Sequence, residues 1–270
     1  MNNTLNSNRL SMLIQRQWIE FGKIYLMSLA VLAGIFIAFY GYSIYEVYRQ
    51  NADNHALQSM LSFRPYLFVF MGLLFITIIS GTYFSNLGQK PKAIFELLLP
   101  ASKLEKFFVA IFYTTILTTV SYLLIFFLVD LGFVSYIRSN FSSSYSYFDQ
   151  ESGREVVVDQ LMFFYKQEIN PKVYLMTFLP YLLSALFLLG SIMFTKFQYI
   201  KSAVLLTVYI LLYILFMLKV IQFFTQDTIR ISEGVFSEEV NILRVICVLG
   251  VLVTVAVWGI GYLRLKEKEV

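Results

Sequence analysis

Few side chains in this sequence have the chemistry of a catalytic or metal site. Its 270 residues include a single histidine, His55, and a single cysteine, Cys247. One imidazole cannot build a metal site or a general base without further ligands, and Cys247 lies in an apolar run with no second cysteine to pair with. We therefore expect no catalytic residue and no metal ligand in this chain.

The composition indicates a membrane protein. Apolar residues make up 58% of the sequence and charged residues only 14%, whereas soluble domains are about one-quarter charged. A helix needs about 20 predominantly apolar residues to cross the hydrocarbon core. Six segments fit this requirement: Ile24 to Tyr45, Tyr66 to Phe84, Phe107 to Val129, Val173 to Phe194, Ser202 to Phe224, and Leu243 to Leu263.

The interiors of these six segments contain almost no ionisable residue. They hold no Asp, Glu or His, and Arg244 is the second residue of the last segment, just inside its outer end. Lys219 is the deepest charge, and it either extends its stem to the headgroups or takes part in a translocation path. The absence of titratable groups near the midplane counts against an ion-coupled carrier, and the absence of a nucleophile or metal ligands counts against an intramembrane protease or phosphatase.

Hydroxyl groups are the main polar groups within the predicted spans. Thr114-Thr115 and Thr118-Thr119 are four residues apart, so they form a hydroxyl stripe on one face of the third span. Such a stripe either makes helix–helix contacts or lines a path for an amphiphilic substrate. The candidate path residues are Thr77, Thr115, Thr119, Tyr209 and Lys219.

Two regions outside the spans have an amphipathic pattern. Residues 1–23 combine apolar residues at helical spacing with basic residues, which predicts a helix along the inner headgroup layer; the alternative is an extension of the first span into water. Residues 130–172 form the longest connection. Their Ser- and Tyr-rich first part predicts a flexible loop, and the apolar residues within Glu155 to Gln167 predict an amphipathic helix on the outer surface.

The positive charges give the orientation. Twelve of the 21 lysines and arginines lie in the N-terminal segment, the second and fourth loops and the C-terminal tail; seven are spread over the first, third and fifth loops. Because Lys and Arg near span ends are retained in the cytoplasm, both termini and residues 88–106 are predicted to be cytoplasmic. The 130–172 loop is then extracytoplasmic.

The cytoplasmic stretch GQKPKAIFELLLPASKLEKFF, Gly88 to Phe108, predicts a short separate helix. Pro91 fits the first helical turn, where its missing N–H is no loss. Pro100 disfavours helical geometry at Leu99, so the helix spans Pro91 to Leu99 and then stops. It lies on the rim of the membrane domain and has an apolar face of its own.

A second helix is predicted directly after this stop. Ser102 and Glu105 have the spacing of a capping box, in which the serine hydroxyl accepts from the Glu105 N–H and the Glu105 side chain accepts from the serine N–H. The new helix therefore begins at Lys103 and runs into the third span.

A permease without titratable groups in its spans needs an external energy source. The sequence has no GxxxxGK[ST] phosphate loop, and GQKPKA lacks the strand–loop–helix context of one. Phe95 to Phe108, FELLLPASKLEKFF, resembles the segment of ABC-2 type permeases in which a short helix after the second span ends in Leu-Pro-x-Ser-[Arg/Lys]-x-Glu. The six-span layout, the amphipathic N-terminal helix and the basic tail are similar as well, whereas the long 130–172 loop departs from that pattern.

The resemblance implies a cytoplasmic partner. In ABC-2 type permeases the short helix is a coupling helix that docks on the ATP-binding subunit, and two permease chains pair around a central path. Carried onto matching positions, it implies that Ile94, Leu97 and Leu98 form the docking face. The implied docking residues are Lys90, Pro91, Lys92, Ile94, Phe95, Glu96, Leu97, Leu98, Pro100, Ser102 and Glu105; Lys90, Lys92 and Glu96 form the polar rim, and Pro100, Ser102 and Glu105 the joint to the third span.

The sequence thus predicts an all-α integral membrane protein with six transmembrane helices, an N-terminal interfacial helix and a short cytoplasmic helix between spans two and three. The resemblance implies a transmembrane subunit that is not an enzyme. Its partners would be two copies of an ABC ATP-binding subunit, which hold the ATP and Mg, together with an identical or related permease chain and membrane lipid, and no nucleic acid.

Two function classes follow from these observations. The resemblance implies export of an amphiphilic, lipid, glycan, peptide or drug-like substrate across a bacterial inner membrane. The alternative class is a non-transporting membrane anchor or sensory component whose cytoplasmic helix recruits a partner. A copurifying ATPase would distinguish the first class from the second.

Overall fold

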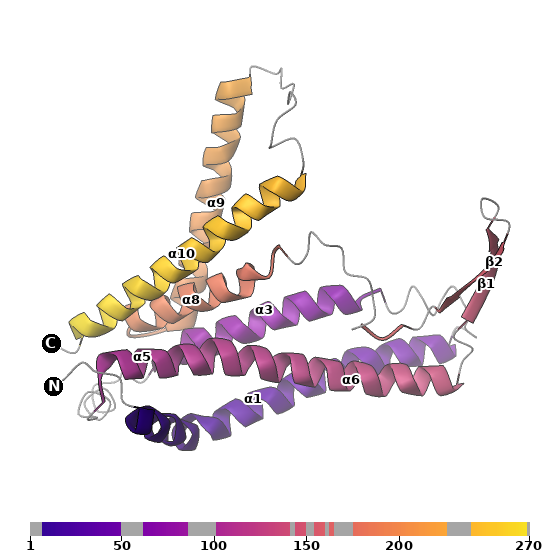
Figure 1. Cartoon of the computed structure of the whole chain (residues 1–270), viewed down its shortest axis with the longest axis horizontal. Helices are drawn as coiled ribbons and strands as arrows, with labels where there is room; N and C mark the ends of the chain where they lie inside the picture. Colours follow the sequence, from indigo (N-terminus) through magenta and orange to yellow (C-terminus); the bar gives the residue numbers. More distant parts are fainter. Residues whose placement is uncertain are drawn as a thin grey trace. The chain divides into compact units, whose positions relative to one another are not determined.

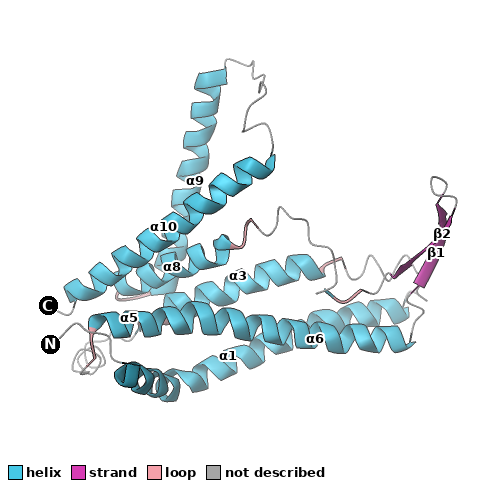
Figure 2. Ribbon diagram, in the orientation of Figure 1, coloured by secondary structure: helices cyan, strands magenta, loops and turns pink. Residues whose placement is uncertain are grey.

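The computed structural model describes residues 7–49, 62–85, 101–140, 144–149, 154–159, 162–164, 175–225 and 239–268 (Figures 1 and 2). Most of this chain is helical. The helices are α1 (Ser7–Arg49), α3 (Arg64–Thr82), α5 (Lys103–Ile111), η2 (Phe112–Leu117, a π-helix), α6 (Thr118–Asn140), α8 (Phe178–Met193), α9 (Gln198–Thr225) and α10 (Glu239–Lys268); the strands are β1 (Ser144–Asp149) and β2 (Arg154–Asp159).

The helices are those of a multi-pass membrane protein. Five stretches are long and apolar enough to cross a membrane: Ser7–Glu46, Arg64–Thr82, Lys103–Asn140, Gln198–Phe216 and Leu243–Glu267. The fourth predicted span, Val173 to Phe194, contains α8, an apolar helix of 16 residues that is shorter than these five. Along α9, apolar residues from Val204 to Leu218 are exposed all round the helix, as is expected of a helix that contacts hydrocarbon.

Two predicted element boundaries differ in the structure. The N-terminal helix and the first span are one continuous helix, α1. The helix of the third span does not end at Val129 but continues to Asn140, so Asp130 belongs to α6 rather than to the following loop. The helical period explains the extension, because Val134 and Ile137 continue the buried face that Phe126 begins.

The only strands in the described residues form a hairpin within the predicted outer loop. β1 and β2 pair antiparallel, with Tyr145 opposite Val158 and Tyr147 opposite Val156. The amphipathic helix predicted for Glu155 to Gln167 was therefore wrong over its first part. Three consecutive β-branched residues, Val156 to Val158, favour a strand there.

The chain divides into two compact units. The first comprises Met1–Gln15, Ile76–Thr118 and Ile169–Val270, and the second comprises Arg16–Phe75 and Thr119–Glu168. In the first unit α8 packs against α9, α10 and η2. Ala185, Leu188 and Ile192 of α8 are each at most 1% exposed, so α8 is the central helix of this unit.

Aromatic rings form the core of the second unit. Phe126 of α6 is fully buried, and its ring centroid lies 5.4 Å from that of Phe36, 4.8 Å from that of Phe68 and 5.1 Å from that of Phe164. These rings come from α1, α3, α6 and the short segment Met162–Phe164. The segment is therefore part of the core although it belongs to no regular element.

The contact between α8 and α9 requires a glycine. A Cβ added at Gly190 would lie 1.9 Å from Ser202 Oγ and 2.8 Å from Ser202 Cβ. Rotation of the serine side chain can move its Oγ but not its Cβ, so the helices would have to separate. We expect Gly190→Ala to lower the free energy of unfolding by about 1–3 kcal/mol, the usual cost of overpacking.

Gly34→Ala is the matched control for this prediction, because a Cβ at Gly34 meets nothing within 4 Å. The measurement is the thermal unfolding midpoint of the detergent-purified protein, followed by circular dichroism. Equal midpoints for the two variants would contradict the close approach of α8 and α9.

Candidate functional site

The predicted docking segment lies mostly outside the described residues. This applies to Lys90, Pro91, Lys92, Ile94, Phe95, Glu96, Leu97, Leu98 and Pro100. The structure describes the last two predicted docking residues, Ser102 and Glu105, at the start of α5. The described part of the candidate site is therefore this joint and the residues that contact it.

The capping box predicted at the joint is confirmed. Ser102 has extended backbone angles, φ −69° and ψ 150°, as an N-cap residue should. The Glu105 N–H donates to Ser102 Oγ at 3.2 Å, and the Ser102 N–H donates to Glu105 Oε2 at 2.8 Å. Both hydrogen bonds satisfy backbone donors that the first turn of α5 would otherwise leave unpaired.

Glu105 is the most deeply buried carboxylate of the joint. Its side chain is fully buried, and its second oxygen, Oε1, lies 4.0 Å from Nε of Arg9 in the first turn of α1. A buried carboxylate is costly unless it is hydrogen-bonded or paired. Glu105 therefore links the cap of α5 to the N-terminal end of α1.

Two further contacts hold this end of the first unit together. The Tyr113 hydroxyl donates to the Ile14 carbonyl at 2.7 Å, and Lys103 Nζ donates to the Lys266 carbonyl near the end of α10 at 3.4 Å. The Phe107 and Tyr262 rings pack edge to face at 6.0 Å. The start of α5 is thus fastened to both the N-terminal and the C-terminal helix.

The cap predicts a measurable stability loss. Ser102→Ala removes the side-chain acceptor for the Glu105 N–H, and N-cap serines are worth about 1 kcal/mol. We expect Ser102→Ala to lower the thermal midpoint and Ser102→Thr, which keeps a capping hydroxyl, to restore most of it. Ser43→Ala is the control, since the half-buried Ser43 donates its hydroxyl to the Phe39 carbonyl one turn earlier in α1. An equal loss in Ser43→Ala would contradict the role of the cap.

The hydroxyl stripe of the third span makes helix–helix contacts. Thr115 Oγ1 lies 3.0 Å from Ser184 Oγ of α8, which lies 2.8 Å from Ser80 Oγ of α3. All three residues are at most 3% exposed. The π-helix η2 carries part of this stripe, and Thr118 Oγ1 donates to the Tyr113 carbonyl at 2.8 Å. Of the two interpretations of the stripe, Thr115 fits the packing role.

The other candidate path residues differ in their exposure. Thr77 is buried at 6% exposure, while Tyr209 and Lys219 lie on exposed parts of α9. Thr119 Oγ1 is buried, and no hydrogen-bond partner for it is found among the described residues. Within the first unit, Thr77 is thus buried whereas Tyr209 and Lys219 are exposed, so these three residues do not share one polar surface.

Sequence reasoning missed a buried charged cluster in the second unit. Arg64, the first residue of α3, is 5% exposed and Asp130 of α6 is 1% exposed; Arg64 Nη1 lies 3.2 Å from Asp130 Oδ1. The Tyr40 hydroxyl of α1 donates to the same oxygen at 2.7 Å. Three helices thus meet at one carboxylate.

The signal for this cluster was present in the sequence. Asp130 stands between two apolar runs, FFLV before it and LGFV after it, and the spacing of Phe126, Asp130, Val134 and Ile137 is helical. A charge inside such a period is expected to be buried and paired. The prediction that the third span ends at Val129 places Asp130 in a loop, and for this reason it misses the buried cluster.

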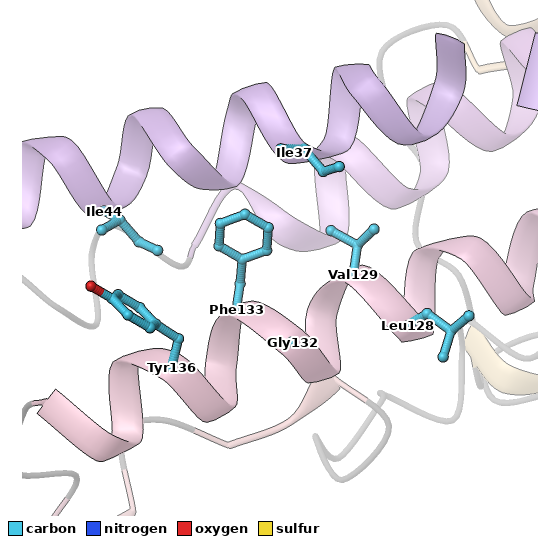
Figure 3. Close-up of a pocket in the computed structure, with 7 residues that line it drawn as sticks. All are labelled: Ile37, Ile44, Leu128, Val129, Gly132, Phe133 and Tyr136. Carbon is cyan, nitrogen blue, oxygen red and sulfur yellow. The ribbon is translucent and has the colours of Figure 1, made fainter. Parts of the chain in front are cut away.

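An apolar groove of about 510 Å³ lies between α1 and α6 of the second unit (Figure 3). Ile37 and Ile44 of α1 line one side. Leu128, Val129, Gly132, Phe133 and Tyr136 of α6 line the other, with the Phe133 ring pointing toward α1. The lining offers hardly any polar group, so the groove suits hydrocarbon rather than a polar ligand.

Comparisons with protein-family models, curated proteins and solved structures found no match. Among the described residues, no group of three or more His, Cys, Asp or Glu side chains is placed to hold a metal ion. The capped start of α5 and the resemblance of the sequence before it to ABC-2 type permeases are the basis on which a function can be proposed.

Proposed function

We propose that this chain is the transmembrane subunit of an ATP-driven ABC-2 type transporter, and that it exports an amphiphilic substrate. Residues 91–99 are the coupling helix that receives a separate ATP-binding subunit. The chain acts in a dimer of permease chains with two ATPase subunits, in a bacterial inner membrane with both termini in the cytoplasm. ATP hydrolysis takes place in the partner.

The observation that carries this proposal is the capped joint at Ser102 and Glu105. The joint follows Leu99-Pro100 directly and begins an uninterrupted helical stretch, Lys103–Asn140, long enough to cross the membrane. A force applied to residues 91–99 would reach the third span through a rigid, hydrogen-bonded start rather than through a loose loop. The same force would also reach α1, through the contact of Glu105 with Arg9 and the hydrogen bond from Tyr113 to the Ile14 carbonyl.

Copurification from the native membrane tests the proposal. We expect a P-loop ATPase, identified by mass spectrometry, at one copy per permease chain, and ATPase activity in the purified complex. A permease that is pure, folded and free of any P-loop ATPase, or a stable partner of another class, would favour the anchor function instead.

The orientation has its own test. In a Cys247→Ser background, a cysteine at Ser139, at the exposed end of α6, should react with a membrane-impermeant maleimide in intact cells. A cysteine at Lys266, in the last turns of α10, should react only after the cells are permeabilised. The reverse pattern would place the joint outside the cell and exclude docking of a cytoplasmic ATPase.

A further inference from the structure

The backbone of Met162–Phe164 is bound from both sides by the Arg64–Asp130 ion pair. Arg64 Nη1 donates to the Met162 carbonyl at 3.0 Å, and the Phe164 N–H donates to Asp130 Oδ2 at 2.9 Å. The two carboxylate oxygens of Asp130 thus have different partners. Oδ1 accepts from Tyr40 and Arg64, and Oδ2 accepts from this segment. The segment thus supplies one hydrogen-bond partner to each member of the ion pair: a carbonyl to Arg64 and an N–H to Asp130.

The Phe164 side chain is seated in the aromatic core. Its ring is 6% exposed and lies 5.1 Å from the rings of Phe68 and Phe126. The neighbouring residues are not seated in this way: Met162 is 43% exposed, and the Phe163 ring lies under Arg138, 5.3 Å from its Cζ. The Phe164 ring and two backbone hydrogen bonds therefore fasten the segment, and the contact of Phe163 with Arg138 adds to them.

We propose that Met162–Phe164 is a strap and that the Arg64–Asp130 pair is its latch. The strap fixes the end of the β1–β2 hairpin, because β2 ends at Asp159 and three residues of chain reach at most about 10 Å. Release of the strap takes the Phe164 ring out of the aromatic core, opens the buried pair to water and frees the end of the second strand. The contacts that α1, α3 and α6 make with one another remain. The latch is thus a local two-state device, and it does not depend on the ATPase partner.

Opening of such a latch is local because the strap residues that the structure describes belong to no helix or strand element. The helices are held by continuous backbone ladders and by many ring contacts, whereas the strap has no ladder of its own. Segments of this kind open independently of the global unfolding of a protein. The water that enters can replace both backbone partners of the strap, so the charges of the pair are not left unsolvated.

Amide hydrogen exchange of the detergent-purified full chain tests the proposal, since the Phe164 N–H itself makes one of the fastenings. Phe164→Ala, which removes the seated ring but keeps the ion pair, should speed exchange in peptides covering 162–164 by on the order of tenfold or more. Amides of α3 and α6 should keep their wild-type rates. Met162→Ala is the matched control, because it removes an exposed side chain and keeps the carbonyl that Arg64 binds, and it should leave the strap peptides unchanged.

A variant of the latch itself completes the test. Arg64→Met with Asp130→Asn removes both charges without leaving one unpaired, and it should also release the strap. Unchanged strap exchange in both this variant and Phe164→Ala would overturn the proposal. Equal acceleration across the strap, α3 and α6 would overturn it as well, because opening would then be global.

Discussion

Leu97→Asp combined with Leu98→Asp is expected to abolish copurification of the ATPase while leaving the permease folded. Both leucines belong to the proposed docking face. Burial of a leucine side chain is worth about 1.5–3 kcal/mol, so losing two of them weakens binding by on the order of 100-fold or more. A carboxylate forced into the same apolar cleft adds a desolvation cost. The measurement is the ATPase-to-permease ratio after affinity purification.

The control for this prediction changes one charge of the polar rim of the same predicted helix. Lys92 lies about 160° from the Ile94 direction at 100° per residue, so Lys92→Glu changes a rim charge without touching the docking face. Rim charges contribute little to affinity, and we expect the ATPase to be retained. If the double aspartate variant keeps its ATPase, residues 91–99 are not the docking helix, whatever the function of the chain.

The joint could be predicted from sequence because its structure is local. A capping box requires only that Ser102 and Glu105 stand three residues apart at the start of a helix, and Pro100 supplies the break that precedes it. Every contact of the box lies within four residues. The partners of its buried carboxylate are different, because Arg9 lies far away in the sequence and only the packing of α1 against α5 brings it near.

The apolar spans could be recognised for a similar reason, since length and composition suffice to locate them. The extent of α6 could not be obtained in this way, because a count of apolar residues stops at the first charge. Asp130 is tolerated inside the helix only because Tyr40, Arg64 and the Phe164 N–H all donate to it. Those donors are 34 to 90 residues away along the chain, and no local pattern indicates them.

The hairpin illustrates a competition between two local signals. The apolar residues of 155–167 fit a helical face, whereas Val156 to Val158 favour an extended chain. The antiparallel pairing with β1 decides for the strand, because each of the three valines pairs with a residue of β1 along the backbone. Only the partner strand could have shown which signal prevails.

Arg64→Met alone is expected to destabilise the protein strongly. It leaves Asp130, 1% exposed, with a negative charge and no cation beside it. Removing one partner of a buried ion pair typically costs about 3–5 kcal/mol. Asp130→Asn alone should cost a similar amount, because it leaves a buried guanidinium without its carboxylate. Both losses are measurable as lower midpoints of thermal or denaturant unfolding.

The double variant Arg64→Met with Asp130→Asn is expected to be more stable than either single variant, with a coupling energy of about 2 kcal/mol or more. The pair is then uncharged, and the asparagine Oδ1 can still accept from the Tyr40 hydroxyl. Tyr40→Phe is the control, since it removes one hydrogen bond to Asp130 but leaves the ion pair whole, and it should cost only about 1 kcal/mol. If the two single losses simply add in the double variant, the coupling energy is zero and the charges of Arg64 and Asp130 do not depend on each other.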